Sequence, residues 1–262
     1  MKVAAIQHDI VWEDAAATHE RVRPLIARAA GHGARLIALP EMFATGFSMQ
    51  PDRIAEAEGG PTERFLLEQS AEHGAYVVAS VAQRGSDGRY RNNAVVARPD
   101  GTVERYAKIH PFSYAGEHER YAAGDRHLTV ELDGLRVTVF VCYDLRFADE
   151  FWAVALDTDL YVVVANWPSV RHEHWRTLLR ARAIENQAYV VGANRVGRAK
   201  NLPHSGGSTV IDPQGNVLVE GGADEELVVA DVEYTAVQET RANYPFLADR
   251  RGYADTYASR PY

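Results

Sequence analysis

The stretch Leu135 to Phe147, LRVTVFVCYDLRF, constrains the fold more than any other part of this chain. It begins with an apolar, β-branched run, which is typical of a central strand buried on both faces. It ends at Cys142, the only cysteine, and polar residues follow at once. A thiol there lies at the carboxyl edge of a sheet, where open α/β sheets carry their chemistry. Because a free cysteine is often a small buried hydrophobic residue, this stretch leaves structural and catalytic interpretations open.

The composition is that of a globular protein, with 262 residues, of which 46% are hydrophobic and 24% are charged. No linker rich in Gly, Ser and Pro divides the chain, which favours one domain over two. A formal net charge of -8 and the lack of a basic stripe argue against nucleic acid as a partner. A single cysteine excludes an internal disulfide framework. Since no segment resembles a signal peptide or a membrane span, we expect a cytoplasmic protein.

Strands and helices alternate along the first half of the sequence. We expect strands at 3–7, 36–39 and 76–81, helices at 20–30 and 62–72, and a hairpin at 93–97 and 102–107. The hairpin turn contains Pro99-Asp100-Gly101, which is typical turn chemistry. This order predicts a mixed sheet with helices on at least one face.

The second half repeats this order at low resolution, which hints at two similar layers packed together. We expect strands at 160–165 and 189–193, helices at 148–156 and 172–187, and a hairpin at 208–211 and 217–219, with which 227–232 could pair. The irregular segment 109–127 contains aromatic residues, so we interpret it as an active-site loop.

The C-terminal segment beyond Tyr234 has no clear period but is rich in aromatic residues. An exposed aromatic tail is best explained by packing on another subunit. We therefore expect residues from about 235 to 262 to lie at the interface of a homo-oligomer, in the simplest case a homodimer.

Glu41, Lys108 and Cys142 each lie just after a predicted strand. A lone glutamate there is usually a surface residue or a helix cap, and a lone lysine is usually solvated. Together they supply what thiol-based amide hydrolysis requires. A thiol needs a base or a nearby cation, and a carboxylate can accept its proton and later donate it to the leaving amine. An ammonium and a backbone N–H can stabilise the oxyanion.

Several segments resemble the nitrilase superfamily of carbon–nitrogen hydrolases. They are Leu39–Phe43, Tyr106–His110, Val141–Phe147, Arg180–Asn186 and Ile211–Gly215, and in this order they span nearly the whole chain. Tyr114–Glu119 and Ala165–Pro168 are most similar to the omega-amidase branch, which hydrolyses the terminal amide of 2-oxo acid amides such as 2-oxoglutaramate. The chain departs from the usual pattern at Ala148, where relatives have proline, and at Gly207, where many have aspartate.

The resemblance implies a four-layer α-β-β-α sandwich, formed as a single domain by residues 1–262, and dimers in which one sandwich packs on another. It implies that Cys142 is the nucleophile and that Glu41 is the general base and later the acid. Lys108 and the backbone N–H of Tyr143 would form the oxyanion hole, and Glu117 would position the site or assist the water. The reaction would pass through a thioester and would require no metal or organic cofactor.

Other residues near these motifs allow two interpretations each. Arg146 could bind a substrate carboxylate, or it could pair with an internal acid and hold its loop. Phe43 and Trp167 lie at strand ends and could line the pocket or simply pack in the core. His172-Glu173-His174 suggests a metal, but it lacks the His-Glu-x-x-His spacing, so we expect no metal site there.

The sequence therefore predicts an enzyme that hydrolyses a small linear amide, with an omega-amidase as the sharpest form of the hypothesis. Another superfamily member, acting on an N-carbamoyl amine, a nitrile or a formamide, is the alternative, because all these reactions share a similar thiol adduct. A non-catalytic binding protein on the same fold would be expected to have lost Glu41, Lys108 or Cys142, and all three are present.

Overall fold

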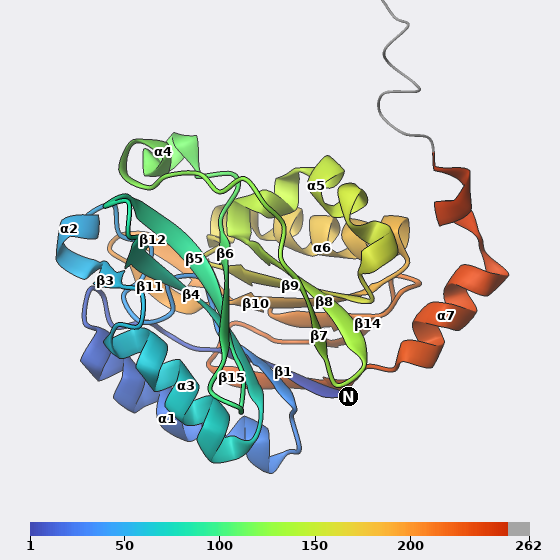
Figure 1. Cartoon of the computed structure of the whole chain (residues 1–262), viewed down its shortest axis with the longest axis horizontal. Helices are drawn as coiled ribbons and strands as arrows, with labels where there is room; N and C mark the ends of the chain where they lie inside the picture. Colours follow the sequence, from blue (N-terminus) through green and yellow to red (C-terminus); the bar gives the residue numbers. More distant parts are fainter. Residues whose placement is uncertain (251–262) are drawn as a thin grey trace, which may run out of the picture.

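Two β-sheets packed face to face form the centre of the computed structural model, which describes residues 1–250 (Figure 1). The first sheet comes mainly from the N-terminal half of the chain. Its principal strands, in spatial order, are β15 (Glu226–Asp231), β1 (Lys2–Gln7), β2 (Leu36–Ala38), β4 (Tyr76–Arg84), β5 (Tyr90–Ala97) and β6 (Val103–Ala107), and the short β3 (Glu56–Ala57) pairs with β4. Strands β1, β2 and β4 are parallel, whereas β4, β5 and β6 are antiparallel, so the prediction of a mixed sheet is confirmed.

The second sheet comes from the C-terminal half of the chain. Its strands, in spatial order, are β14 (Val217–Glu220), β13 (Thr209–Ile211), β10 (Tyr189–Asn194), β9 (Leu160–Ala165), β8 (Leu135–Val141) and β7 (Thr129–Leu132). Strands β8, β9 and β10 are parallel. Every residue of β9 and β10 is buried. Burial on both faces explains why these strands appear in the sequence as unbroken apolar runs.

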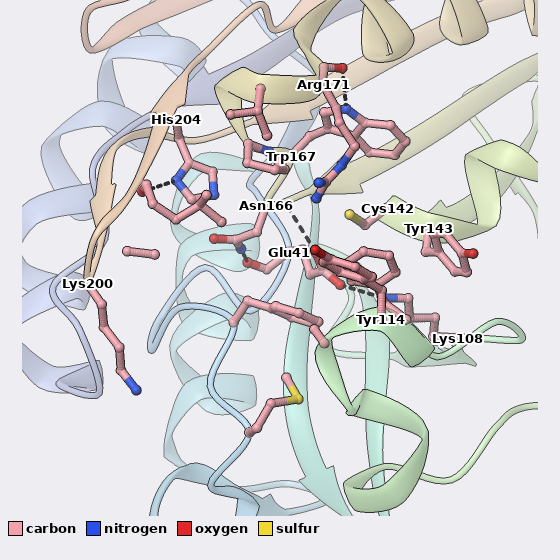
Figure 2. A pocket seen from close by; sticks show the side chains of 18 of the residues that line it. Glu41, Lys108, Tyr114, Cys142, Tyr143, Asn166, Trp167, Arg171, Lys200 and His204 are labelled. Atoms are coloured by element: carbon pink, nitrogen blue, oxygen red, sulfur yellow. Dashed lines mark hydrogen bonds and ion pairs between the residues drawn. The ribbon is translucent and has the colours of Figure 1, made fainter.

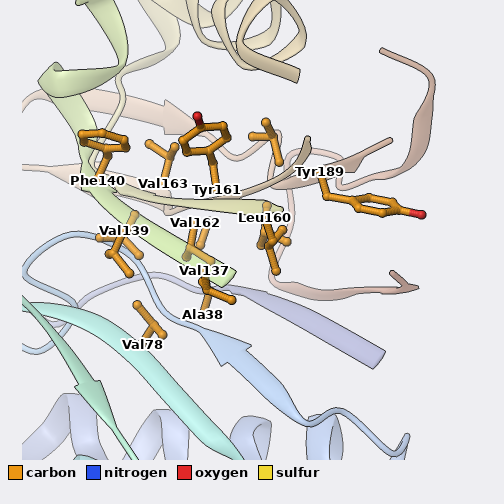
Figure 3. Packing of buried hydrophobic residues seen from close by; sticks show 14 of the residues in the cluster. Ala38, Val78, Val137, Val139, Phe140, Leu160, Tyr161, Val162, Val163 and Tyr189 are labelled. Atoms are coloured by element: carbon orange, nitrogen blue, oxygen red, sulfur yellow. The ribbon is translucent and has the colours of Figure 1, made fainter. Parts of the chain in front are cut away.

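Side chains that alternate along each strand divide the core into an inner and an outer part. Figure 3 shows Ala38 and Val78 of the first sheet opposite Val137 and Val139 of the second, in the layer between the sheets. Phe140, the next residue along β8, points away from the first sheet, toward the side of the second sheet that helices cover. The alternation places successive residues of one strand in different layers of the sandwich.

Helices cover both outer faces of the paired sheets (Figure 1). Helices α1 (Ala15–Gly31) and α3 (Pro61–His73) cover the first sheet, and α5 (Ala148–Ala153) and α6 (His172–Asn186) cover the second. Helix α1 begins after Asp14, whose carboxylate accepts a hydrogen bond from the Ala17 N–H at 3.0 Å. The predicted α-β-β-α sandwich is thus confirmed. No helix within residues 1–250 is long and apolar enough to cross a membrane.

Short elements lie around the end of the sandwich where β2, β6 and β8 finish. The predicted active-site loop contains the 3-10 turn η1 (Ser113–Ala115) and helix α4 (Glu117–Arg120), and helix α2 (Pro51–Ile54) lies nearby. A separate two-stranded hairpin, β11 (Val196–Ala199) and β12 (Leu202–Ser205), was not predicted from the sequence. These elements surround the candidate active site.

The C-terminal region differs from the prediction at two places. Strand β15 does not pair with β13 or β14 but lies antiparallel to β1, in the other sheet. The first part of the predicted tail is helix α7 (Tyr234–Asn243), which is followed by the 3-10 turn η5 (Phe246–Asp249). Only Val237 and Thr240 of α7 are buried, so its apolar period is too weak to reveal a helix. The tail aromatics Tyr253, Tyr257 and Tyr262 lie outside the described residues.

Candidate active site

Glu41, Lys108 and Cys142 come together at one end of the sandwich (Figure 2). Glu41 lies three residues after β2, whereas Lys108 and Cys142 follow β6 and β8 directly. All three line one cavity of about 470 Å³. Strands of both sheets end at this side of the sandwich, so residues that are far apart in the sequence line the same cavity.

Lys108 lies between two carboxylates in a buried cluster. Its Nζ is 2.8 Å from Glu41 Oε1 and 2.8 Å from Glu117 Oε2. Asn92, a central residue of β5, donates to the same carboxylates, to Glu41 at 2.8 Å and to Glu117 at 3.0 Å. These side chains are at most 1% exposed. Two carboxylates facing one ammonium give a site of fixed geometry and a formal charge of about −1.

The protonation of this cluster follows from its burial and its charges. Burial alone would lower the pKa of Lys108, but Glu117 and Glu41 together raise that pKa above its ordinary value. The ammonium is therefore charged throughout the neutral range. Burial raises the pKa of Glu117, and the nearby Lys108 opposes that shift. Because its pKa is raised overall, Glu117 takes up a proton more readily than an exposed glutamate would.

Cys142 begins a 3-10 turn, η2 (Cys142–Arg146), with a backbone φ of 46°. The buried Asp144 holds this turn, because its carboxylate accepts hydrogen bonds from the Val141 N–H at 3.0 Å, the His110 N–H at 2.9 Å and the Tyr106 hydroxyl at 2.8 Å. A positive φ in a residue other than glycine is strained and persists only where its surroundings fix it. The turn directs Cys142 to the cavity.

Burial raises the pKa of the Cys142 thiol well above its ordinary value, and the Glu41 carboxylate raises it further. The sulfur is therefore a thiol rather than a thiolate at neutral pH. A protonated nucleophile has to transfer its proton to a base as it attacks. Glu41 is the carboxylate next to it that can accept this proton.

Two asparagines that the sequence analysis did not single out fix the orientation of Glu41. Asn166 follows β9, and its backbone N–H donates to Glu41 Oε2 at 3.0 Å while its side chain donates to the Glu41 carbonyl oxygen. Asn92 holds Oε1 and is itself held by the Ser80 hydroxyl, which donates to Asn92 Oδ1 at 2.8 Å. Only Asn166 could have been proposed as a site residue from the sequence, because it lies at the end of a strand. Asn92 lies inside a strand, where no local pattern indicates a role in the site.

The cavity wall combines aromatic side chains with cations. Tyr143, Trp167 and Arg146 line it, as expected from the sequence, and Arg171 and Lys200 add two cations that were not predicted. Among residues 1–250, Arg146 has no carboxylate within ion-pair distance. Its guanidinium instead lies 4.8 Å from the centre of the Trp167 ring. The alternative in which Arg146 pairs with an internal acid is therefore not supported.

Two predicted site residues do not line the cavity. Phe43 is fully buried in the core between the first sheet and its helices, where its ring centre lies 5.9 Å from that of His19 and 6.3 Å from that of Phe65. Of the two interpretations of Phe43, packing in the core is correct and lining the pocket is wrong, because its side chain points to the helix layer. Glu117 lies behind Lys108 and contacts the ammonium rather than the open space.

The described part of the chain contains no group of three or more His, Cys, Asp and Glu side chains arranged to hold a metal ion. Of the suggestive His172-Glu173-His174 motif, His172 contacts Ser205 at 3.3 Å and His174 contacts Arg146 at 3.1 Å. The motif thus supports the walls around the cavity.

A four-layer sandwich with a cysteine, a glutamate and a lysine around one cavity defines the class of nitrilase-type hydrolases. The chain belongs to the carbon–nitrogen hydrolase family, whose model matches residues 2–242. It is 38% identical over 252 residues to omega-amidase YafV of Yersinia enterocolitica, a match that covers 95% of this chain and 96% of that protein. A 2-oxoglutaramate amidase of Bacillus subtilis is 32% identical over 254 residues, with 95% and 97% covered.

A solved structure extends the similarity from sequence to fold. The chain superimposes with a TM-score of 0.92 and 38% identity on a CN-hydrolase superfamily protein of Xanthomonas campestris, which carries an arsenic adduct in its active site. This match covers 97% of this chain and 98% of that one. The likeness therefore includes the whole sandwich and the loops around the cavity.

Proposed function

We propose that this enzyme hydrolyses the terminal amide of a small linear 2-oxo acid amide, such as 2-oxoglutaramate, to a carboxylate and ammonia. The observation that carries the proposal is the buried contact of Lys108 with two carboxylates beside the Cys142 thiol. Relatives named omega-amidase and 2-oxoglutaramate amidase, at 38% and 32% identity over most of the chain, support this choice of substrate.

The first half of the proposed reaction forms a thioester. Cys142 Sγ attacks the amide carbonyl carbon while Glu41 accepts the thiol proton. The carbonyl oxygen becomes an oxyanion, which the Lys108 ammonium and the Tyr143 N–H stabilise. As the C–N bond breaks, Glu41 donates its proton to the leaving nitrogen, and ammonia departs.

The second half hydrolyses the thioester. Glu41, again a carboxylate, accepts a proton from a water molecule that attacks the thioester carbonyl carbon. The second oxyanion is bound like the first, the C–S bond breaks, and the sulfur regains its proton from Glu41. Glu117 keeps Lys108 in place through both halves, because its Oε2 contacts the ammonium at 2.8 Å in addition to the contact from Glu41.

We also propose that the chain forms one domain and assembles in the cytoplasm as a homo-oligomer, in the simplest case a homodimer. Support comes from the segment of α7 and η5, which projects from the sandwich (Figure 1). Just after α7, Tyr244 and Phe246 are 50% and 60% exposed. Aromatic side chains so exposed are typical of a contact surface. Light scattering measures the mass of the particle, and a monomer at micromolar concentration would contradict the proposal.

The decisive experiment measures ammonia release from 2-oxoglutaramate beside a nitrile and an N-carbamoyl amino acid, with Cys142→Ala as the control. We expect release from the 2-oxo acid amide and none from the variant. A preference for either other substrate would replace the proposed substrate with another of the superfamily. Unchanged turnover by Cys142→Ala would refute the mechanism.

A further inference from the structure

We infer that Arg171 binds the carboxylate of the substrate and so selects linear amides that carry an acid group at the end opposite to the amide. This inference rests on the proposed function, and it names the residue that recognises the substrate. It assigns the role to Arg171 rather than to Arg146, the arginine nearest the cysteine in sequence.

Arg171 is anchored to two walls of the cavity. It ends the 3-10 turn η4 (Ser169–Arg171), and its carbonyl oxygen accepts a hydrogen bond from Trp167 Nε1 at 2.8 Å. Its guanidinium carbon lies 5.5 Å from the centre of the Phe112 ring. The Phe112 N–H in turn donates to Glu117 Oε2 at 2.5 Å. The guanidinium is thus held in a fixed relation to the reacting cluster.

The donors of the Arg171 guanidinium are available to a ligand. Within residues 1–250, no side-chain or backbone acceptor lies within hydrogen-bond distance of them, and no carboxylate forms an ion pair with this arginine. Figure 2 shows its side chain extending into the pocket toward the Cys142 side. A half-buried guanidinium that faces a cavity without an anionic partner is suited to bind a carboxylate with two parallel hydrogen bonds.

The other basic groups of the cavity are less suited to this role. Arg146 Nη2 is 3.1 Å from His174 Nδ1 and its guanidinium stacks on Trp167, so it supports the wall. Lys200 is exposed at the hairpin tip, where its Nζ lies 5.1 Å from the centre of the Trp12 ring. Burial lowers the pKa of His204 to about 4, so that imidazole is neutral at neutral pH.

The other residues that line the cavity explain why the substrate carboxylate would bind at Arg171. Lys108 is already occupied by Glu41 and Glu117, and a second anion beside them would be repelled. Much of the outer lining is apolar, contributed by Phe47, Met49 and other residues. A substrate carboxylate placed against those side chains would lose its hydration without gaining a partner.

Two amides of equal length test this assignment. Glutaramate has a five-carbon chain with an amide at one end and a carboxylate at the other, and pentanamide has a chain of the same length without the charge. The kcat/KM of each amide is measured for wild type, Arg171→Met and Arg171→Lys. Lys200→Met is the matched control, because it also removes one cation from the same cavity. For Arg171→Met we expect kcat/KM for glutaramate to fall about 10- to 150-fold relative to pentanamide, mainly through KM. Arg171→Lys should recover part of this loss, and Lys200→Met should change the ratio little.

An equal loss on both amides, or the same loss in Lys200→Met, would overturn the assignment. A binding measurement separates it from the proposed function. Calorimetry of glutarate with the Cys142→Ala protein should detect binding that Arg171→Met weakens by a similar factor. If wild type hydrolyses neither 2-oxoglutaramate nor these two amides, the proposed function fails. Glutarate binding that is independent of Arg171 would overturn the carboxylate site even if the amides are hydrolysed.

Discussion

Replacement of Lys108 by methionine tests the buried charge cluster most directly. The substitution keeps the length of the side chain but leaves Glu41 and Glu117 facing each other in a buried site. Removal of one partner from a buried ion pair typically costs about 3–5 kcal/mol, because the remaining charge has neither water nor a counter-charge. The cluster can avoid part of this cost by taking up a proton.

The protonation of Glu117 limits the cost and makes it depend on pH. The unfolded-state pKa of a glutamate is 4.5, so protonation at pH 7 costs about 3.4 kcal/mol and at pH 5 about 0.7 kcal/mol. In the variant the folded state holds a proton that the unfolded state has lost, so its stability falls as pH rises above 4.5. We expect the deficit of Lys108→Met against wild type to grow by up to about 2.7 kcal/mol between pH 5 and pH 7.

Urea unfolding at both pH values measures this deficit, with Lys108→Met/Glu117→Gln as the matched control. The double variant has one carboxylate fewer, so its deficit should change much less with pH. Activity provides a second readout, because loss of one oxyanion donor costs about 100- to 1000-fold in kcat. A deficit that is the same at both pH values, or that the second substitution leaves unchanged, would refute the coupling of the two carboxylates through Lys108.

Three further substitutions follow from the same geometry. Cys142→Ala removes one sulfur and should abolish ammonia release while the thermal unfolding curve stays close to that of wild type. Asp144→Asn replaces one of two acceptor oxygens by a donor, so we expect a loss of about 1–3 kcal/mol in urea unfolding and a lower kcat; unchanged values would show that the turn holds Cys142 without it. Burial lowers the pKa of His8 to about 4, so the folded state binds fewer protons than the unfolded state and loses stability as pH falls from about 6.5 to about 4. Replacing His8 by leucine should remove about 3 kcal/mol of that acid sensitivity, as calorimetry across this pH range would measure.

The parts of the fold that local patterns determine were predictable from the sequence. The strands around 160–165 and 189–193 are buried on both faces, so their apolar runs coincide closely with β9 and β10. The partner of β15 was not predictable, since pairing with β1 joins residues more than 200 positions apart. Strand pairing at such a separation leaves no local signal, and a nearby hairpin was the natural but wrong choice.

The candidate site also has parts that were predictable from the sequence and parts that were not. Glu41, Lys108 and Cys142 could be proposed because each follows a strand, and such ends meet at one edge of the sheets. The direction of a side chain just beyond a strand is not encoded locally, which is why the sequence left two positions open for Phe43, the pocket and the core in which it lies. Asn92 was missed because it contacts Glu41 only through the register of β5.

The nucleophile and the proposed base have one feature in common, which is backbone strain beside each of them. Met42, next to Glu41, has a φ of 41°, and Cys142 has a φ of 46°. Conformations of this kind cost about 1–3 kcal/mol each, and neighbouring hydrogen bonds maintain them. Ser80 accepts the Met42 N–H at 2.7 Å, and Asp144 accepts the Val141 N–H at 3.0 Å. Neither Ser80 nor Asp144 lines the cavity, so neither contacts the substrate. Both residues act by fixing the orientation of Glu41 and Cys142. Their loss should therefore lower kcat more than it changes KM.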